Sequence, residues 1–385
     1  MNRYAALWSL DPQVTYLNHG SYGACPTAVL KLQAQLREEL EREPVDFLSR
    51  RLPGRLQEAR VALSNFVGAN PADMAFVVNA TTGVNAVLRS LTFAPGDELL
   101  TTSHVYAACH KTLRYIAHRV GARIVIATLP FPIVDDEQIV AAVHAAVTGR
   151  TKLALIDHIT SPTALILPIA RLVRELDDRG VDTLVDGAHV PGMIPLALDE
   201  IGAAYYTGNC HKWLCAPKGA AFLHVRRDRQ EDLHPTVISH GYSSGFHAEF
   251  DWTGTAEPSA WLCVPEAIRF MGALLPGGWP ALMTHNRATA IACRKVVEET
   301  IGAKSAAPEH MLGSMATVLL PKGAKGSVAD PFDRDRVTTW VRERGIESWF
   351  HDEPAPLLRI SAQIYNDTEQ YRRLSVLLKE VLHGG

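Results

Sequence analysis

Two short stretches of the chain each end an apolar run in side chains that can do chemistry. The first provides the carboxylate of Asp186 and the imidazole of His189, and the second provides Lys212 directly after His211. A lysine in a half-apolar turn loses its proton more easily than a surface lysine, because desolvation disfavours the ammonium form. Such a lysine can form an imine with an aldehyde, and a nearby carboxylate can keep a pyridine nitrogen protonated. The two stretches together therefore predict a site for pyridoxal 5'-phosphate (PLP).

A third stretch places hydroxyl groups where a predicted strand passes into a predicted helix. Residues 75–78 are a short apolar run, and Thr81 and Thr82 follow at the start of a helical pattern. The free amides and the positive end of a helix dipole point at an anion in such a place. The alternative is that Thr81 or Thr82 only caps the helix. With a PLP lysine further along the chain, a phosphate site is the favoured interpretation.

Two further segments carry rings and polar groups that could contact a flat cofactor or its substrate. His104 and Tyr106 follow a predicted strand at 98–102, and either ring could stack on the cofactor, although a core aromatic is the commoner explanation. Residues 16–26 form a loop with two glycines and several hydrogen-bonding side chains. This loop is either an N-terminal turn or a segment that folds back over the site.

The order of the predicted elements gives the fold class. Strands expected at 75–78, 98–102, 122–127, 152–156, 181–185 and 220–225 alternate with helical patterns. Repeated units of this kind predict an open, mostly parallel α/β sheet between helices, with ligands beyond the carboxyl ends of the strands. A smaller α/β unit follows, with strands at 315–320 and 357–361. We expect an N-terminal segment (1–25), a large PLP-binding domain (26–257) and a small C-terminal domain (258–385).

The composition limits the class of protein. The chain has 385 residues, of which 47% are hydrophobic and 21% charged, with a net charge of -3. This near-neutral balance gives no reason to expect nucleic acid or a membrane surface as partner. Six cysteines in a chain of this length do not make a disulfide framework. No apolar run reaches membrane-spanning length and the first residues do not form a signal peptide, so we expect a cytoplasmic protein.

Other chemistries have weaker support in the sequence. The pattern Gly-Tyr-Ser-Ser-Gly at 241–245 matches a nucleophile elbow, which needs a strand before it and a helix after it. Residues 246–251 are a poor helix start, so a serine hydrolase that uses Ser243 is a remote alternative. Cys210 and Cys215 flank His211 without a second cysteine pair, so no metal site is expected. No G-x-G-x-x-G follows a predicted strand, which argues against a dinucleotide fold.

The residues resemble the signature of the class V aminotransferase-fold PLP enzymes. The resemblance is carried by the clusters at 186–189, 211–212, 359–361 and 365–366. A closer similarity to the isopenicillin N epimerase-like branch is carried by residues 16–23, 157–161, 206–213 and 252–255. It covers nearly the whole chain and implies the aspartate aminotransferase type I fold with PLP. The branch also includes carbon–sulfur lyases, such as those that act on hercynylcysteine sulfoxide, so the resemblance is less specific for the substrate.

The resemblance also implies how the residues around the cofactor are used. Lys212 forms the imine with PLP, Asp186 pairs with the pyridinium, and Tyr106 is favoured over His104 for stacking. It places His189 and Ser161 near the ring hydroxyl. Around the phosphate it places Thr81, Thr82, Asn209 and His211. Thr255 reaches the phosphate of the other subunit, which implies a homodimer with shared sites.

For the substrate, the resemblance implies that Arg359 binds the α-carboxylate of the amino acid, a role that its planar guanidinium suits. Asn18 and Tyr22 are expected to complete the substrate site. Class V cysteine desulfurases need a nucleophilic cysteine shortly before this arginine, and residues 345–354 contain none, which argues against that activity.

The expected chemistry begins when Lys212 removes the Cα proton and leaves a quinonoid carbanion delocalised into the cofactor ring. Reprotonation from the opposite face gives epimerisation or racemisation, whereas loss of a sulfur group from Cβ gives a lyase. Protonation at the cofactor carbon gives an aminotransferase. We expect an epimerase, with the carbon–sulfur lyase or the aminotransferase as alternative. Tyr22 and His19 are candidates for the opposite-face acid.

Overall fold

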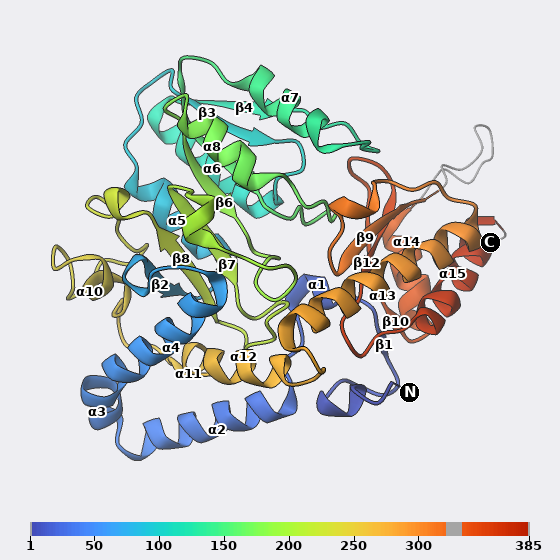
Figure 1. The fold of residues 1–385 in the computed structure, drawn as a ribbon, viewed down its shortest axis with the longest axis horizontal. Helices are drawn as coiled ribbons and strands as arrows, with labels where there is room; N and C mark the ends of the chain where they lie inside the picture. Colours follow the sequence, from blue (N-terminus) through green and yellow to red (C-terminus); the bar gives the residue numbers. More distant parts are fainter. Residues whose placement is uncertain (1, 321–332, 384–385) are drawn as a thin grey trace.

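The computed structural model describes residues 2–320 and 333–383 (Figure 1). The large part of the molecule is built on a seven-stranded sheet in the order β2-β8-β7-β6-β5-β3-β4, and β8 is antiparallel to both of its neighbours. The other neighbouring pairs are parallel, so the predicted fold class is confirmed. The strands are β2 (Met74–Val77), β3 (Glu98–Thr102), β4 (Arg123–Ala127), β5 (Thr151–Asp157), β6 (Asp182–Asp186), β7 (Tyr205–Asn209) and β8 (Ala221–Val225).

Helices cover both faces of this sheet because successive residues of each strand point to opposite sides. In β5, Leu153 and Leu155 pack with α5 and α6, whereas Ala154 and Ile156 join the core on the other face. The covering helices are α4 (Leu52–Val67), α5 (Ala80–Ser90), α6 (Ala107–Val120), α7 (Asp136–Ala146) and α8 (Ile169–Asp177). Nearly continuous burial along β3, β5 and β6 is what a parallel strand between two helical layers requires.

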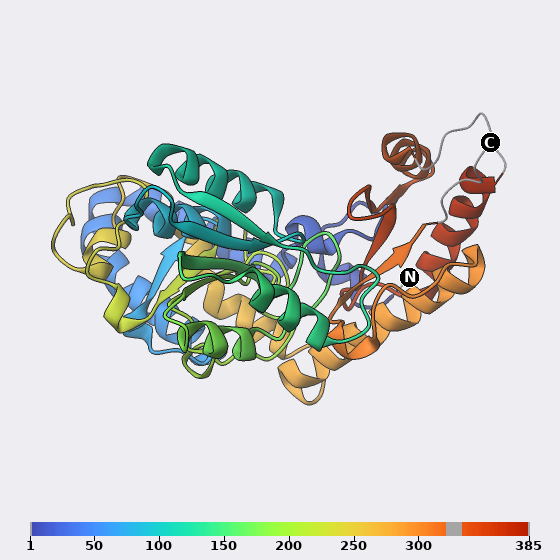
Figure 2. The same cartoon turned by 90° about the horizontal axis from the view of Figure 1, so that it is seen from above.

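The C-terminal part is a three-stranded antiparallel sheet in the order β11-β12-β9, packed against helices. Figure 2 shows the large sheet toward one end of the molecule and this C-terminal part toward the opposite end. Its elements are α13 (Gly278–Ile301), β9 (Met315–Leu319), α14 (Arg334–Glu343), β10 (Ile346–Glu347), β11 (Trp349–His351), β12 (Leu357–Ser361) and α15 (Thr368–His383). The N-terminal segment is attached here, because β1 (Thr15–Tyr16) pairs in parallel with β10.

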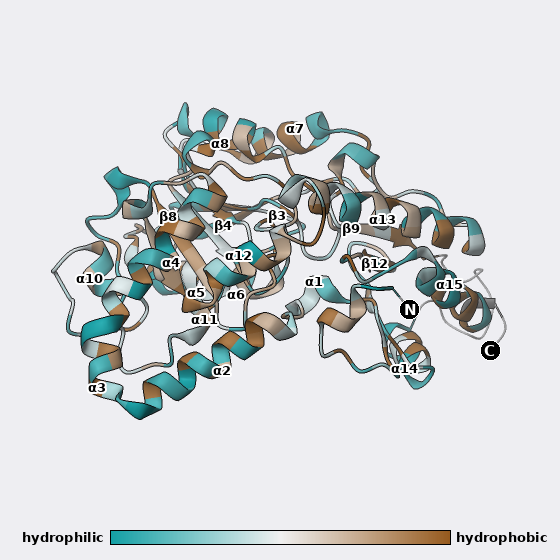
Figure 3. Cartoon of the chain, turned by 60° about the horizontal axis from the view of Figure 1, so that its bottom comes forward, coloured by the Kyte–Doolittle hydropathy of each residue, from teal (hydrophilic) through white to brown (hydrophobic). Residues whose placement is uncertain are grey.

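The remaining helices connect these parts or lie on the outside. They are α1 (His19–Tyr22), α2 (Thr27–Arg42), α3 (Pro44–Asp46), α9 (Leu198–Ile201), α10 (Phe246–Phe250), α11 (Ser259–Leu262) and α12 (Val264–Gly272). Figure 3 shows hydrophilic residues along α2 and α3 on the outside and hydrophobic strands in the interior. The domain boundary at 257/258 stays a prediction; α11 and α12, which follow it, pack on α2 and α4, whereas α13 packs on α15. Within the described ranges, no helix has the length and apolar character that crossing a bilayer needs.

The segment around Ser243 corrects one expectation. Residues 246–250 do form a helix, α10, because Phe250 buries its ring in the core beside β2 and Glu249 accepts the Ser243 N–H. However, the described residues between β8 and Ser243 contain no strand, which a nucleophile elbow requires. The Glu249 carboxylate pairs with His234, and the described residues hold no hydrogen bond from the Ser243 hydroxyl to an imidazole.

Candidate active site

Lys212 lies in the turn that follows β7, and its Nζ is 3.1 Å from Nε2 of His189. Burial and then the charge of Arg359 lower the pKa of Lys212 to about 8. Burial, followed by the Lys212 charge, also lowers the pKa of His189 well below its ordinary value, so the imidazole is neutral. Its Nε2 therefore accepts from Lys212, and Nδ1 has no partner among the described residues. The pair places an easily deprotonated amine beside a neutral ring.

Asp186 ends β6 on the same side of the sheet. Its Oδ1 accepts the Ala188 N–H at 3.0 Å, and the Cys109 thiol donates to Oδ2 at 3.2 Å. The charge of Asp186 acts on Lys212 and favours its protonated form. The carboxylate and the amine thus face the same space, as the strand ends predicted.

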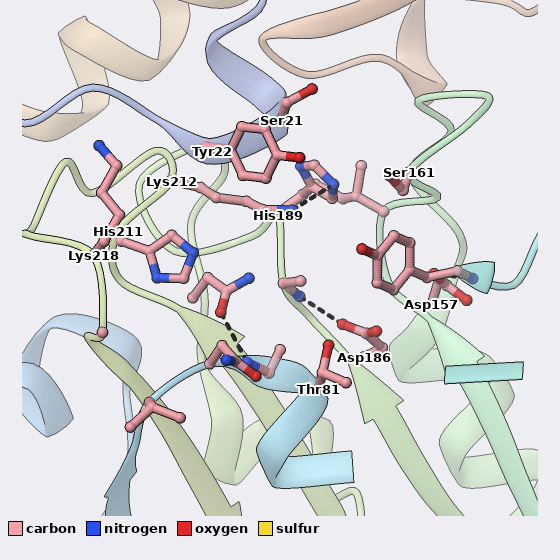
Figure 4. A pocket seen from close by; sticks show the side chains of 18 residues that line it. Ser21, Tyr22, Thr81, Asp157, Ser161, Asp186, His189, His211, Lys212 and Lys218 are labelled. Atoms are coloured by element: carbon pink, nitrogen blue, oxygen red, sulfur yellow. Dashed lines mark hydrogen bonds between the residues drawn. The ribbon is translucent and has the colours of Figure 1, made fainter. Parts of the chain in front are cut away.

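That space is a cavity of about 360 Å³, within the range of small-molecule sites. Figure 4 shows side chains from strand ends, from the start of α5 and from the N-terminal segment directed into it. Of the residues predicted from the sequence, the cavity brings together Lys212, Asp186, His189, Thr81, Tyr106, Ser161, Asn209, His211 and Tyr22.

The start of α5 forms one end of the cavity. Asn79 caps the helix, since its Oδ1 accepts the backbone N–H of Thr82 at 2.8 Å and the Thr82 hydroxyl at 3.1 Å. Thr82 is therefore turned toward the cap and lines neighbouring hollows instead of the main cavity. Asn209 accepts the Ala80 N–H through Oδ1 at 2.9 Å, which leaves its Nδ2 amide as a donor. Thr81 and Asn209 thus offer polar groups at a helix N-terminus.

The two candidate stacking rings have different surroundings. Tyr106 is 41% exposed and lines the cavity, whereas His104 is buried outside the lining. His104 is held by Thr163, whose hydroxyl is 2.9 Å from Nδ1, and by edge contact with Phe131. Tyr106 is therefore the one of these two rings that is open to the cavity.

His19 is also held away from the cavity. Its Nε2 donates to the Lys212 carbonyl at 3.0 Å, and Nδ1 accepts from the Tyr365 hydroxyl at 2.7 Å. Burial lowers the pKa of His19 to about 3. Gly23 packs against the same turn, because a Cβ built on it would lie 2.1 Å from the His211 carbonyl oxygen. The N-terminal segment therefore supports the backbone that carries Lys212.

Arg359, on β12, lies behind the cavity lining and is 1% exposed. Its Nη1 donates to the Ser161 carbonyl at 2.8 Å, and Nη2 donates to Ser21 Oγ at 2.9 Å and Asn18 Oδ1 at 3.3 Å. The guanidinium lies 4.3 Å from the centre of the Trp349 ring. Burial lowers the pKa of Arg359 to about 10. Asn18 is thus a partner of Arg359 and does not itself line the cavity.

Thr255 is exposed and lies outside the cavity of its own chain, so its role toward a second subunit stays a prediction. The sequence reasoning assigned no role to Asp157, Ser21 or Lys218, which also line the cavity. Asp157 had the same signal as Asp186, a carboxylate at a strand end. Lys218 donates to the Gly23 carbonyl at 3.0 Å. In the sequence it is a lysine followed by a glycine, a pattern that does not indicate any particular function.

The cavity fits PLP by its chemistry. It offers an amine with a lowered pKa, a carboxylate with two donors, an orphaned buried Nδ1 on His189 and polar groups at a helix N-terminus. These are the groups that an aldehyde, a pyridine nitrogen, a ring hydroxyl and a phosphate each require.

Comparisons with known proteins agree with this chemistry. The model of the family Aminotransferase class-V matches residues 27–374. The chain is 34% identical to the isopenicillin N epimerase of Streptomyces clavuligerus over 384 residues, which cover 95% of this chain and 94% of that protein. It is 30% identical to an L-cysteine desulfhydrase of Arabidopsis thaliana over 402 residues, 96% of this chain and 88% of that one.

Solved structures of similar fold include the cystine C–S lyase C-DES in complex with cysteine persulfide. It has a TM-score of 0.84 at 18% identity, over 98% of this chain and 99% of that chain. A cysteine desulfurase of Escherichia coli, CsdA, has a TM-score of 0.80 at 18% identity, over 99% and 98% of the two chains. The chain belongs to the class V aminotransferase family and is a PLP-dependent enzyme.

Proposed function

We propose that the protein epimerises an amino acid at Cα, in the manner that the name of its isopenicillin N epimerase relative indicates. The observation that carries the proposal is the Lys212 amine, with a pKa lowered to about 8, inside a cavity that also contains phenols. An amine of this pKa can both remove and return a proton near neutral pH. A phenol gives a second proton carrier, which a two-base inversion uses to reprotonate Cα from the face opposite Lys212.

PLP supplies an electron sink to such a reaction when it is bound. In our proposal Lys212 would hold PLP covalently, Asp186 would accept from its ring nitrogen, and Tyr106 would contact its ring. His189 and Ser161 would bind the ring hydroxyl. We assign the phosphate to Thr81, Asn209 and His211, and we drop Thr82 from this role because its hydroxyl donates to the Asn79 cap and it does not line the cavity.

His211 has a specific reason to bind a phosphate. Its Nδ1 donates to the Ala220 carbonyl at 3.1 Å, which leaves Nε2 toward the cavity. Burial and then Lys212 lower the pKa of His211 to about 4. An anion in the cavity would reverse this shift, so that Nε2 gains a proton and donates.

The proton carrier opposite Lys212 is, in our proposal, Tyr22. Tyr22 is 73% exposed, belongs to α1 and supplies a phenol to the cavity from the N-terminal segment, whereas Lys212 reaches the cavity from the turn after β7. His19, the other candidate, has both ring nitrogens engaged by Lys212 and Tyr365 and lies outside the cavity lining. We therefore drop His19 from this role.

A carbon–sulfur lyase is the second candidate, because the chain is similar to an L-cysteine desulfhydrase over 96% of its length. Both reactions begin when Lys212 removes the Cα proton. They differ in whether Cα is reprotonated or a sulfur group leaves Cβ. A desulfurase is disfavoured, because residues 345–354, which contain β10 and β11, contribute no thiol.

The test is incubation with isopenicillin N and, separately, with L-cysteine in deuterated water. Deuterium at Cα with inversion, and no keto acid, supports the epimerase. Pyruvate, ammonia and sulfide from L-cysteine support the lyase and reject the epimerase. Tyr22→Phe sharpens the result, since it should reduce inversion much more than it reduces exchange of the proton that Lys212 removes.

We also propose a cytoplasmic homodimer with shared sites. The six cysteines are free and buried, which suits a reducing compartment. Thr255 is exposed, and the nearby segment exposes the apolar side chains Val237 and Ile238. Light scattering should give twice the mass of 42.2 kDa. Mixing Lys212→Ala with Thr255→Val subunits should restore an intact site in the mixed dimers; a monomer would reject the shared site.

A further inference from the structure

A second carboxyl group lies beside Asp186, and the roles given above leave it unused. Asp157 ends β5 in the register position directly across from Asp186 on β6. Its side chain is 2% exposed and lines the cavity. Oδ1 accepts the Tyr106 N–H at 3.2 Å, whereas Oδ2 has no partner among the described residues.

The two carboxyl groups are not equally well supported as anions. Asp186 receives two donors, the Ala188 N–H and the Cys109 thiol, one on each oxygen. From the other residues that the structure describes, Asp157 receives one donor, the Tyr106 N–H, on Oδ1. Two buried carboxylates on neighbouring strands repel each other, so a proton stays on the one whose charge is less well stabilised. An unpaired hydroxyl also costs much less on burial than an unpaired charged oxygen.

We propose that Asp157 is a positioning acid that keeps its proton beside an ionised Asp186, so that the pair presents one negative charge to the cavity. This inference rests on the proposed PLP site. A protonated Asp157 holds the Tyr106 backbone through Oδ1 and carries its proton on Oδ2, the oxygen that has no other partner among the described residues. It thereby fixes the start of α6, which carries the stacking ring, without adding a second charge.

The other titratable groups that face Asp157 support this distribution. Lys212 faces it from the turn after β7 and Cys109 from α6. Burial, and then the Asp186 charge, raise the pKa of Asp157 well above its ordinary value, and the Lys212 charge opposes this only in part. A second negative charge here would stabilise the ammonium form of Lys212 and weaken it as a base. The proton on Asp157 thus keeps Lys212 reactive.

The test compares Asp157→Asn with Asp186→Asn. Asparagine at 157 keeps a neutral group and the acceptor for the Tyr106 N–H, so it mimics the protonated acid. The infrared spectrum of the wild-type protein at neutral pH should contain the C=O band of a buried carboxylic acid, and Asp157→Asn should remove it. Asp157→Asn should leave the PLP dissociation constant within about threefold, whereas Asp186→Asn should raise it about tenfold or more, as expected for a hydrogen bond to a charged group.

The inference is overturned if Asp157→Asn leaves the carboxylic acid region of the infrared spectrum unchanged, or if it weakens PLP binding as much as Asp186→Asn does. If Asp157→Asn does not fold, Asp157→Ala and a pH titration of the wild-type band answer the same question. A wild-type protein that fails to bind PLP would reject the proposed function. Infrared spectra of the protein without cofactor would still show whether Asp157 holds a proton.

Discussion

Replacing Gly23 with alanine perturbs the catalytic turn from the N-terminal segment without changing any catalytic side chain. Gly23 follows α1 with φ 70° and ψ 166°, a conformation that is open essentially only to glycine. A Cβ built there lies 2.1 Å from the His211 carbonyl oxygen and 2.9 Å from the Lys212 Cα. These are backbone atoms that cannot rotate away. Either the N-terminal segment or the turn that carries Lys212 must therefore move.

The cost has two parts, and a matched variant separates them. Gly245 has φ 101° and ψ 164°, and a Cβ built on it would have nothing within 4 Å. Gly245→Ala therefore carries only the backbone strain, about 1–3 kcal/mol. Gly23→Ala adds the collision with the turn, for which forced overpacking costs about 1–3 kcal/mol. We expect a loss of about 2–6 kcal/mol in the free energy of unfolding for Gly23→Ala.

The assay is denaturant unfolding of both variants, together with PLP titration followed by visible absorption. A shift of about 1 Å in the Lys212 turn should reduce turnover roughly a hundredfold in Gly23→Ala. Gly245→Ala should bind PLP and turn over substrate as the wild type does. If the two variants lose the same stability and bind PLP equally well, the N-terminal segment does not position Lys212, and the reasoning is refuted.

Four further predictions concern Lys212 and Arg359. Lys212→Ala should abolish the visible absorption of the protein-bound cofactor; an unchanged spectrum would mean that the lysine is misassigned. Arg359→Ala should weaken amino-acid binding by about 1.5–3 kcal/mol. The matched control is Arg359→Lys, which keeps the positive charge but loses the planar fork. An unaltered affinity in Arg359→Ala would remove Arg359 from the site. Because burial lowers the pKa of Lys212 to about 8, PLP uptake should rise with pH to a midpoint near 8, and a midpoint near 10.5 would contradict the assignment. Between these two values the unfolded chain binds more protons at this lysine, so the stability of the cofactor-free protein should rise with pH across that window.

The elements that the sequence predicted well are those whose residues carry their own signal. The apolar runs of β5, β6 and β7 are buried, and side chains that can do chemistry stand at or just after the ends of these runs. Asp186 and Lys212 could therefore be placed at one edge of the sheet. The pairing of Asp157 with Asp186 depends on the register of β5 against β6, which no local pattern contains. In the same way, the antiparallel direction of β8 depends on the path of the chain after β7.

Helix and cap chemistry set a second limit on prediction from sequence. Thr81 and Thr82 are equivalent as residue types, but the Asn79 cap engages the Thr82 hydroxyl and leaves Thr81 on the cavity side. Likewise, α10 forms because tertiary burial of Phe250 overrides the weak helix propensity of its sequence. Both outcomes depend on contacts between residues that are distant or equivalent in the sequence, so a local sequence pattern does not predict them.

We propose that the carboxylate of the amino-acid substrate binds Arg359, and the surroundings of this residue support the proposal. Its hydrogen-bond acceptors are Ser161, which follows β5, and Asn18 and Ser21 from the N-terminal segment, and all of these acceptors are neutral. Within the described ranges no carboxylate forms an ion pair with this buried guanidinium. A buried cation without an anion is costly, and a carboxylate accepts a stronger hydrogen bond than a hydroxyl or an amide does. A substrate carboxylate that displaces Ser21 or Ser161 would therefore offset the free-energy cost of burying the Arg359 charge without an anion. Because Ser21 lies beside Tyr22, the same displacement brings the substrate to the N-terminal segment that carries the proposed proton donor.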